Sequence, residues 1–98
     1  MSRGERTTRI TVTIAARRAG LEPHVVRHCV QVGLVGATLT EDELIELRRV
    51  RRLTDLGVNL ESVEIILRMR RRIVALQEER ARLEALVKMS RTRDTLET

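Results

Sequence analysis

The sequence contains no Phe, Tyr or Trp, and it has only one Cys and one Pro in 98 residues. Without aromatic side chains a core must be built from Leu, Ile, Val, Ala and Met, and single-stranded nucleic acid finds no ring on which to stack. The single cysteine, Cys29, cannot close a disulfide within the chain. No apolar run approaches the roughly 20 residues of a membrane-spanning helix, and no secretory signal pattern opens the sequence. We therefore expect a small cytoplasmic protein without a membrane segment.

Motifs typical of enzymes are also missing. The sequence has no glycine-rich phosphate loop and no nucleophile accompanied by a base. His24 and His28 lie four positions apart with Cys29 beside them, but no third well-placed metal ligand accompanies them. Cys29 falls in the middle of an expected helix, where it fits a small buried side chain better than a reactive thiol. We expect no catalytic activity, no metal and no cofactor.

Positive charge is present and unevenly distributed. Of the formal net charge of +5, residues 1–35 contribute +4 (six Arg, two Glu), residues 36–59 contribute −1 (four Arg, five acids) and residues 60–98 contribute +2 (nine bases, seven acids). A local excess of arginine attracts phosphate backbones through the release of counterions. The first third of the chain is therefore the candidate surface for an anionic partner.

The other arginine clusters fit solvated helix faces. The arginines at positions 48, 49, 51 and 52 and at 70–72 alternate with acids one or two turns away, such as Glu46 and Glu64. Pairs of opposite charge at helical spacing account for most of them. Only some of the first cluster is expected to reach a DNA backbone.

A first helix is expected near the N-terminus, after a polar segment, residues 1–9, that we interpret as a flexible arm. The alternation of apolar residues over positions 10–14 also fits a short strand. Thr13, however, can cap a helix that ends at Gly20, and we prefer the helix.

A second helix should begin at Pro23, because proline suits the first helical position. It is expected to run to about Val32 and to stop at Gly33, after which Leu34 and Val35 fold back as apolar plugs. The side chains expected to face inward are Val26, Cys29 and Val30. Two short helices joined by a tight glycine-containing turn form the outline of a helix-turn-helix.

The segment from Thr40 to Glu43 has the capping-box pattern, with Thr40 as the cap and Glu43 reaching back to its amide. A third helix should follow and stop at Gly57. Its expected inward row is Leu44, Leu47, Val50, Leu53 and Leu56. These three helices would form a helix-turn-helix domain over residues 10–57.

A long fourth helix is expected over residues 58–90, capped by Asn59, because no Gly or Pro interrupts the chain from Leu60 to Met89. An apolar seam with alternating spacings of three and four runs along it, with Arg80 as the one misfit. The seam residues are Ile66, Met69, Ile73, Leu76, Leu83 and Val87. Such a narrow stripe suits a two-stranded coiled coil, and we prefer an antiparallel homodimer. Residues 91–98 are interpreted as a polar tail that frays.

Two stretches of this sequence carry a family resemblance. The first stretch resembles the opening helix-turn-helix of the MerR family of regulators and reads IAARRAGLEPHVVRHCVQVGLV. In that family a Gly ends the first helix and an Arg precedes a Gly-Leu pair. Here these residues are Gly20, Arg27 and Gly33-Leu34. The second stretch is similar to the family's third helix, the turn after it and the start of the dimerisation helix, and reads LTEDELIELRRVRRLTDLGVNLESVEIIL. The resemblance covers roughly residues 10–86. It implies an all-α fold, a MerR-like helix-turn-helix with a long C-terminal dimerisation helix that forms a coiled coil.

The chain departs from that family at the wing, a small hairpin that contacts DNA. Only residues 36–39 join Val35 to Thr40, too few for two strands and a turn. The segment at residues 57–60, GVNL, resembles the corresponding segment of two sub-groups of the family. The heat-shock repressors bind operator DNA, whereas the chaperone modulators bind the J-domain of a DNA-binding co-chaperone.

Two functions therefore remain open. The first is a homodimeric, DNA-binding transcriptional regulator that contacts a two-fold site in double-stranded DNA. Its expected DNA-binding residues are Arg17, Arg18, His24, Arg27, His28 and Gln31. The second is an adaptor of the chaperone-modulator kind that uses the same fold against a J-domain. We favour the first.

Overall fold

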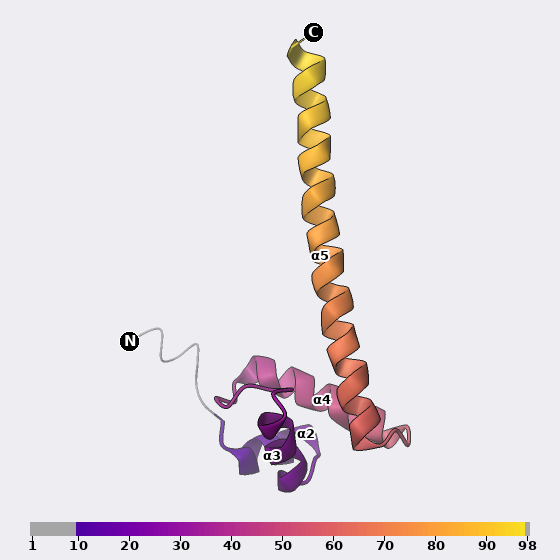
Figure 1. The fold of residues 1–98 in the computed structure, drawn as a ribbon. Coiled ribbons are helices and arrows are strands. Elements are labelled where there is room, and N and C mark those ends of the chain that lie inside the picture. Colours follow the sequence, from indigo (N-terminus) through magenta and orange to yellow (C-terminus); the bar gives the residue numbers. More distant parts are fainter. Residues whose placement is uncertain (1–9, 98) are drawn as a thin grey trace, which may run out of the picture. The chain divides into compact units, whose positions relative to one another are not determined.

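The computed structural model describes residues 10–97, which form four helices and no strand. Their order along the chain is α2, α3, α4 and α5 (Figure 1). The chain up to Ile65 makes one compact unit, and the chain from Ile66 onward makes a second. The all-helical prediction is thus confirmed for this part of the chain. The arm expected at residues 1–9 lies outside the described residues.

Helix α2 spans Val12–Ala19, which confirms the preferred helix over the alternative strand. Its cap is Thr11, whose side-chain oxygen accepts a hydrogen bond from the Ile14 amide at 3.2 Å. The prediction that Thr13 is the cap was wrong. The Ala15 amide already donates to the Thr11 carbonyl at 2.8 Å, so the helical ladder begins two residues earlier than expected.

Helix α3 spans Pro23–Gln31, and its first position is occupied by the proline as expected. Val26 and Cys29 are fully buried, while Val30 is only half-buried. Gly33 follows in the left-handed conformation, with φ of 78°. The amides of Leu34 and Val35 then donate back to the Cys29 carbonyl at 2.9 and 3.2 Å. Both side chains are buried, as expected for apolar plugs over the end of α3.

Helix α4 spans Glu41–Asp55 and begins directly after Thr40, as the sequence pattern predicts. The capping box itself is not formed as expected, because the Thr40 side chain makes no cap hydrogen bond. Leu56 was also wrongly placed in the inward row, since it is 78% exposed. A row spaced strictly by three residues turns by about 60° at each step on a helix of 3.6 residues per turn. Four such steps carry the row from the buried Leu44 round to the solvent.

The core of the first unit is made entirely of small and aliphatic side chains. Three alanines on α2 let it pack closely against α3 and α4. The buried apolar residues of this unit are Ala15, Ala16, Ala19, Val26, Cys29, Leu34, Val35, Leu39, Leu44, Leu47, Val50 and Val63. A core without aromatic rings stays small, which fits a unit of this length.

Helix α5 spans Leu60–Glu97, and the Asn59 side chain caps it by accepting from the Ser62 amide at 2.8 Å. It continues past residue 90, where we predicted its end, so the fraying expected of residues 91–98 is not seen up to Glu97. Even polar residues of modest helix propensity extend a helix that has already begun, because each adds one hydrogen bond. No helix within residues 10–97, α5 included, is long and apolar enough to cross a membrane.

Candidate nucleic-acid interface

One face of α3 gathers four polar side chains. His24, Arg27 and Gln31 are exposed and His28 is half-buried. At 100° per residue their spacings of three, one and three confine them to an arc of about 100°. Val26 and Cys29 occupy the opposite, buried side, so the four predicted α3 residues share one outward face. Each can form hydrogen bonds with base edges or phosphate oxygens.

The turn that sets α3 against α2 is closed by backbone hydrogen bonds and by an arginine from α4. Gly20 has φ of 74°, and the amides of Gly20 and Leu21 donate to the carbonyls of Arg17 (3.3 Å) and Ala16 (2.9 Å). This is the arrangement in which glycine commonly ends a helix. The Arg51 guanidinium donates to the Gly20 carbonyl and also pairs with Asp55 at 2.8 Å. The arginine thus fastens the turn between α2 and α3 to α4.

We expect Gly20→Ala to destabilise the fold more than Gly33→Ala. Both glycines have a positive φ, which costs an alanine about 1–2 kcal/mol. A Cβ at Gly20 would in addition collide with the Arg51 guanidinium, whereas nothing lies within 4 Å of a Cβ at Gly33. Urea unfolding of the two variants measures the difference. Equal losses of unfolding free energy would show that Arg51 moves aside without cost and does not fasten the turn.

The two predicted arginines of α2 differ in their surroundings. Arg18 makes a two-pronged ion pair with Glu41 at the start of α4, at 2.7 and 3.0 Å. Arg17 is exposed and, within residues 10–97, forms no ion pair or side-chain hydrogen bond, and the same holds for Arg27 on α3. Within the described residues Arg17 and Arg27 thus have no competing acid, whereas the Arg18 guanidinium is held by Glu41.

The Arg18–Glu41 pair also has an electrostatic signature. The hydrogen bonds from Arg18 lower the pKa of the Glu41 carboxyl below its usual value. A carboxyl with a lowered pKa in the folded chain stabilises it at pH values above its unfolded pKa. That contribution is lost as the pH falls through the lowered value. At neutral pH the pair is thus fully charged and joins α2 to α4.

Cys29 is buried beneath the polar face of α3 and near two acids. Burial raises the pKa of its thiol to about 11, and the negative charges of Glu64 and Glu46 add to the effect. On the outer side, His28 Nε2 lies 3.6 Å from Glu64 Oε1. Within residues 10–97 no three His, Cys, Asp or Glu side chains are grouped so that they could hold a metal ion. The thiol is thus a packing group held in its neutral form.

We expect Cys29 in the folded chain to react with iodoacetamide about 100-fold more slowly at pH 8 than in the unfolded chain. The thiolate is the reactive form, and a pKa of about 11 instead of 9.0 reduces its fraction about 100-fold. Mass spectrometry of timed samples with and without 6 M guanidinium measures the two rates. Similar rates would show an accessible, activated thiol.

The connection from α3 to α4 is anchored by three buried apolar side chains, while residues 36–38 are exposed. Leu34, Val35 and Leu39 are all buried, and the Ile10 amide donates to the Leu39 carbonyl at 2.7 Å. The described part of the chain has no strand here, as the four-residue link predicts. Residues 10–97 therefore contain no hairpin between α3 and α4.

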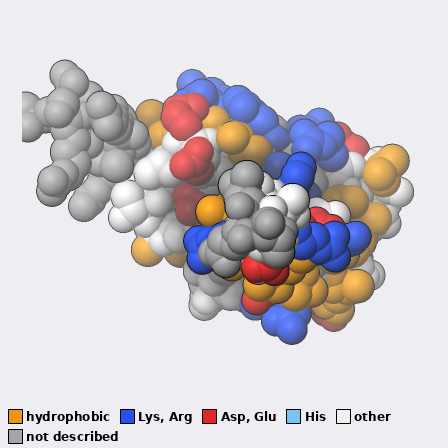
Figure 2. All heavy atoms as spheres, turned by 90° about the horizontal axis from the view of Figure 1, so that it is seen from above, with side chains coloured by type: hydrophobic (Ala, Val, Ile, Leu, Met, Phe, Trp, Pro, Cys, Tyr) orange, Lys and Arg blue, Asp and Glu red, His pale blue; other side chains and the backbone are white. Residues whose placement is uncertain are grey.

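The arginine clusters on α4 are partly neutralised, as expected. Arg49 pairs with the nearly buried Glu46 at 2.9 Å, and Arg51 pairs with Asp55, while Arg48 and Arg52 are exposed. On the face shown in Figure 2, basic side chains lie beside acidic and hydrophobic ones. Two of the four arginines on α4 are thus paired with acids of the same helix.

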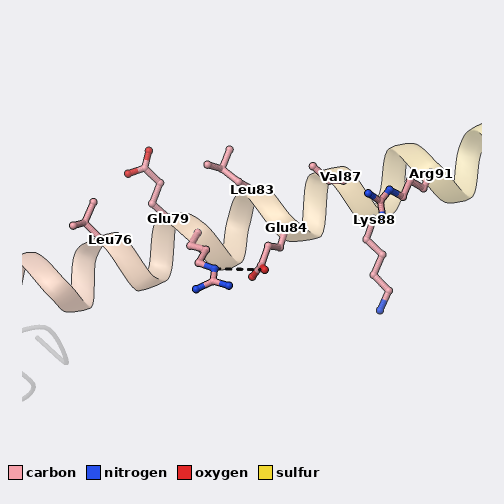
Figure 3. A pocket seen from close by; sticks show the side chains of 8 residues that line it. Leu76, Glu79, Leu83, Glu84, Val87, Lys88 and Arg91 are labelled. Carbon is pink, nitrogen blue, oxygen red and sulfur yellow. Dashed lines mark ion pairs between the residues drawn. The ribbon is translucent and has the colours of Figure 1, made fainter.

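The predicted seam of α5 is an exposed apolar row. Its six members, Ile66, Met69, Ile73, Leu76, Leu83 and Val87, are between 40% and 59% exposed. Leu76, Leu83 and Val87 project from the same side of the helix and line an open hollow (Figure 3). Apolar side chains repeated on one side of a helix over this length are typical of a surface that another protein covers.

Comparison of the chain with protein-family models, with curated proteins and with solved structures finds no match. The function must therefore be argued from the residues themselves.

Three contacts near α3 could not be foreseen from the sequence. They are Arg18 with Glu41, Arg51 with the Gly20 carbonyl, and His28 with Glu64. Their partners lie on different helices, 23 and 31 positions apart in the first two cases, so no helical spacing relates them. A local charge pattern indicates only partners within one or two turns.

Proposed function

We propose that this chain is a DNA-binding transcriptional regulator of the MerR-like kind, which acts as an antiparallel homodimer on a two-fold site. The observation that carries the proposal is the outward face of α3. Four side chains that can read base edges or bind phosphate lie together there, opposite the buried Val26 and Cys29. In helix-turn-helix proteins the second helix of the pair enters the major groove.

The charge distribution supports a duplex as the partner. Residues 1–35 carry a net charge of +4, and Arg17 and Arg27 have no ion-pair partner within residues 10–97. A free guanidinium presents a fork of donors that matches phosphate oxygens. The absence of aromatic residues favours double-stranded over single-stranded nucleic acid.

The apolar row of α5 supports the homodimer. A two-fold site needs two copies of α3 held about 34 Å apart, one turn of the duplex. Residues 68–95 of a single copy are exposed apart from the half-buried Val74. A helix so little covered gains stability from a second copy on its apolar row.

Fluorescence anisotropy with a labelled mixed-sequence duplex tests the proposal. We expect binding at about 50 mM salt that weakens steeply by 200 mM, because each phosphate contact releases counterions. Binding that is absent at low salt would contradict a DNA-binding function.

A chaperone-modulator adaptor is the second candidate, and one observation favours it. Within residues 10–97 no strand follows α3, so the hairpin that the MerR resemblance implies for DNA contact is missing. In this case the chain would bind the J-domain of a co-chaperone through the same helical unit. Titration of a purified J-domain into labelled chain, beside the duplex titration, separates the two functions.

A further inference from the structure

The side chains that flank the apolar row of α5 select one way of pairing two copies. We propose that two α5 helices pair antiparallel about a centre between Val74 and Ala75, with Arg72 of each copy opposite Glu79 of the other. The inference rests on the proposed homodimer and adds how the two α5 helices are aligned along each other. Arg72 and Glu79 are both exposed and form no ion pair within residues 10–97.

Each position of α5 has a defined place relative to the row. In heptad notation the row occupies positions a and d, and positions g and e flank it. The a and d residues are Ile66, Met69, Ile73, Leu76, Arg80, Leu83 and Val87. The g residues are Ile65, Arg72, Glu79 and Leu86, and the e residues are Arg70, Gln77, Glu84 and Arg91.

Arg80 occupies a row position without leaving an unmatched charge in it. Its guanidinium pairs with the Glu84 carboxylate on the same helix at 3.5 Å. Its aliphatic stem remains available to pack against a second copy, as long basic side chains do at such positions. The pairing of copies is therefore decided by the flanking residues.

A parallel pair is disfavoured by like charges. In a parallel coiled coil each a residue meets its own copy, and each g residue faces the following e residue. Arg80 would meet Arg80 of the second copy, and Glu79 would face Glu84 of the second copy on both sides. Like charges held opposite each other are destabilising.

In an antiparallel pair g faces g and e faces e, and only alignments one heptad apart keep the apolar layers matched. A centre at Glu78 sets Glu79 against Glu79 and leaves Ile65 opposite an arginine. This alignment also places Arg70 opposite Glu84 of the second copy. The Glu84 carboxylate, however, already pairs with Arg80 of its own helix. A centre between Ala81 and Arg82 places arginine opposite arginine at both the g and the e positions.

The alignment centred between Val74 and Ala75 avoids all of these conflicts. Arg72 faces Glu79 of the second copy twice by symmetry. Ile65 faces Leu86 of the second copy, and these two apolar residues, 59% and 61% exposed in one chain, lie outside the row. The alignment thus places opposite charges together and covers exposed apolar surface that a centre at Glu78 leaves opposite arginine.

The distance between two spin labels tests the alignment. With Lys88→Cys in a Cys29→Ala background, a rise of 1.5 Å per residue predicts labels about 40 Å apart along the axis. A centre at Glu78 predicts about 30 Å, and a parallel pair less than about 20 Å. A dimer with either shorter distance overturns the alignment and leaves the homodimer standing. A chain that stays monomeric at micromolar concentration overturns the homodimer itself.

A charge swap provides a second test that leaves Cys29 in place. Arg72→Glu and Glu79→Arg should each weaken dimerisation several-fold, and the double variant should restore it to within about twofold of the parent chain. Glu78→Arg and Arg82→Glu, on the side of α5 away from the row, serve as controls and should leave dimerisation unchanged. Single variants without effect, or a double variant no better than the single ones, would overturn the pairing of Arg72 with Glu79.

Discussion

Replacing Ile73 by aspartate is expected to turn the proposed dimer into a monomer at micromolar concentration. Ile73 lies in the middle of the apolar row and is 52% exposed in the single chain. Full burial of an exposed isoleucine contributes about 1.5–3 kcal/mol, roughly half of which remains to be gained at Ile73, and a dimer contains two copies of it. A carboxylate at the same place would also have to leave water without a partner. We expect dimerisation to weaken at least about 100-fold, which corresponds to about 2.7 kcal/mol.

Sedimentation velocity at several concentrations measures this effect. Ala85→Asp is the matched control, because it places the same charge on the exposed side of α5 away from the row. The control should sediment as the parent chain does. If Ile73→Asp also sediments as the parent chain does, the row is not the surface that joins the copies.

Arg27→Ala is expected to lower the affinity for duplex DNA about tenfold and to reduce the salt slope by about 2 for a dimer. Arg27 lies on the polar face of α3, exposed and without an ion-pair partner in the described part of the chain. A phosphate contact contributes about 0.9 to the slope of log affinity against log salt, and the dimer makes it twice. Arg18→Ala should lower affinity less, because Glu41 holds that guanidinium.

Anisotropy titrations at four salt concentrations measure both quantities. Arg82→Ala removes the same charge from an exposed position on α5 and controls for the change in net charge. It should leave the slope unchanged. Equal effects of Arg27→Ala and Arg82→Ala would show that α3 makes no particular contact with the duplex.

Helix positions were largely predictable from the sequence. Apolar residues at three- and four-residue spacing placed α3, α4 and α5, and the turn after α3 was expected from Gly33, which has φ of 78°. The polar face of α3 was also predictable, since fixed rotation per residue puts His24, Arg27 and Gln31 on one side once the helix is known. These features depend on neighbours within one or two turns.

Features at the ends of helices were predicted less well. The cap of α2 is Thr11 instead of Thr13, and the Thr40 side chain forms no cap hydrogen bond. Several residues near a helix end can supply a cap, and small differences in backbone geometry select among them. Leu56 was misplaced for a different reason, because apolar spacing alone does not show where the buried face of α4 ends.

The sequence by itself determined that the chain is helical, that α3 presents a polar face and that α5 carries a narrow apolar row, because each follows from helical periodicity. Only the tertiary structure decided which arginines are free. It brings Glu41 to Arg18 and the Gly20 carbonyl to Arg51 from distant positions, and it leaves Arg17 and Arg27 without an ion-pair partner in residues 10–97. The physical reason is that an ion pair needs two groups within about 4 Å in space. Packing of one helix against another sets that distance.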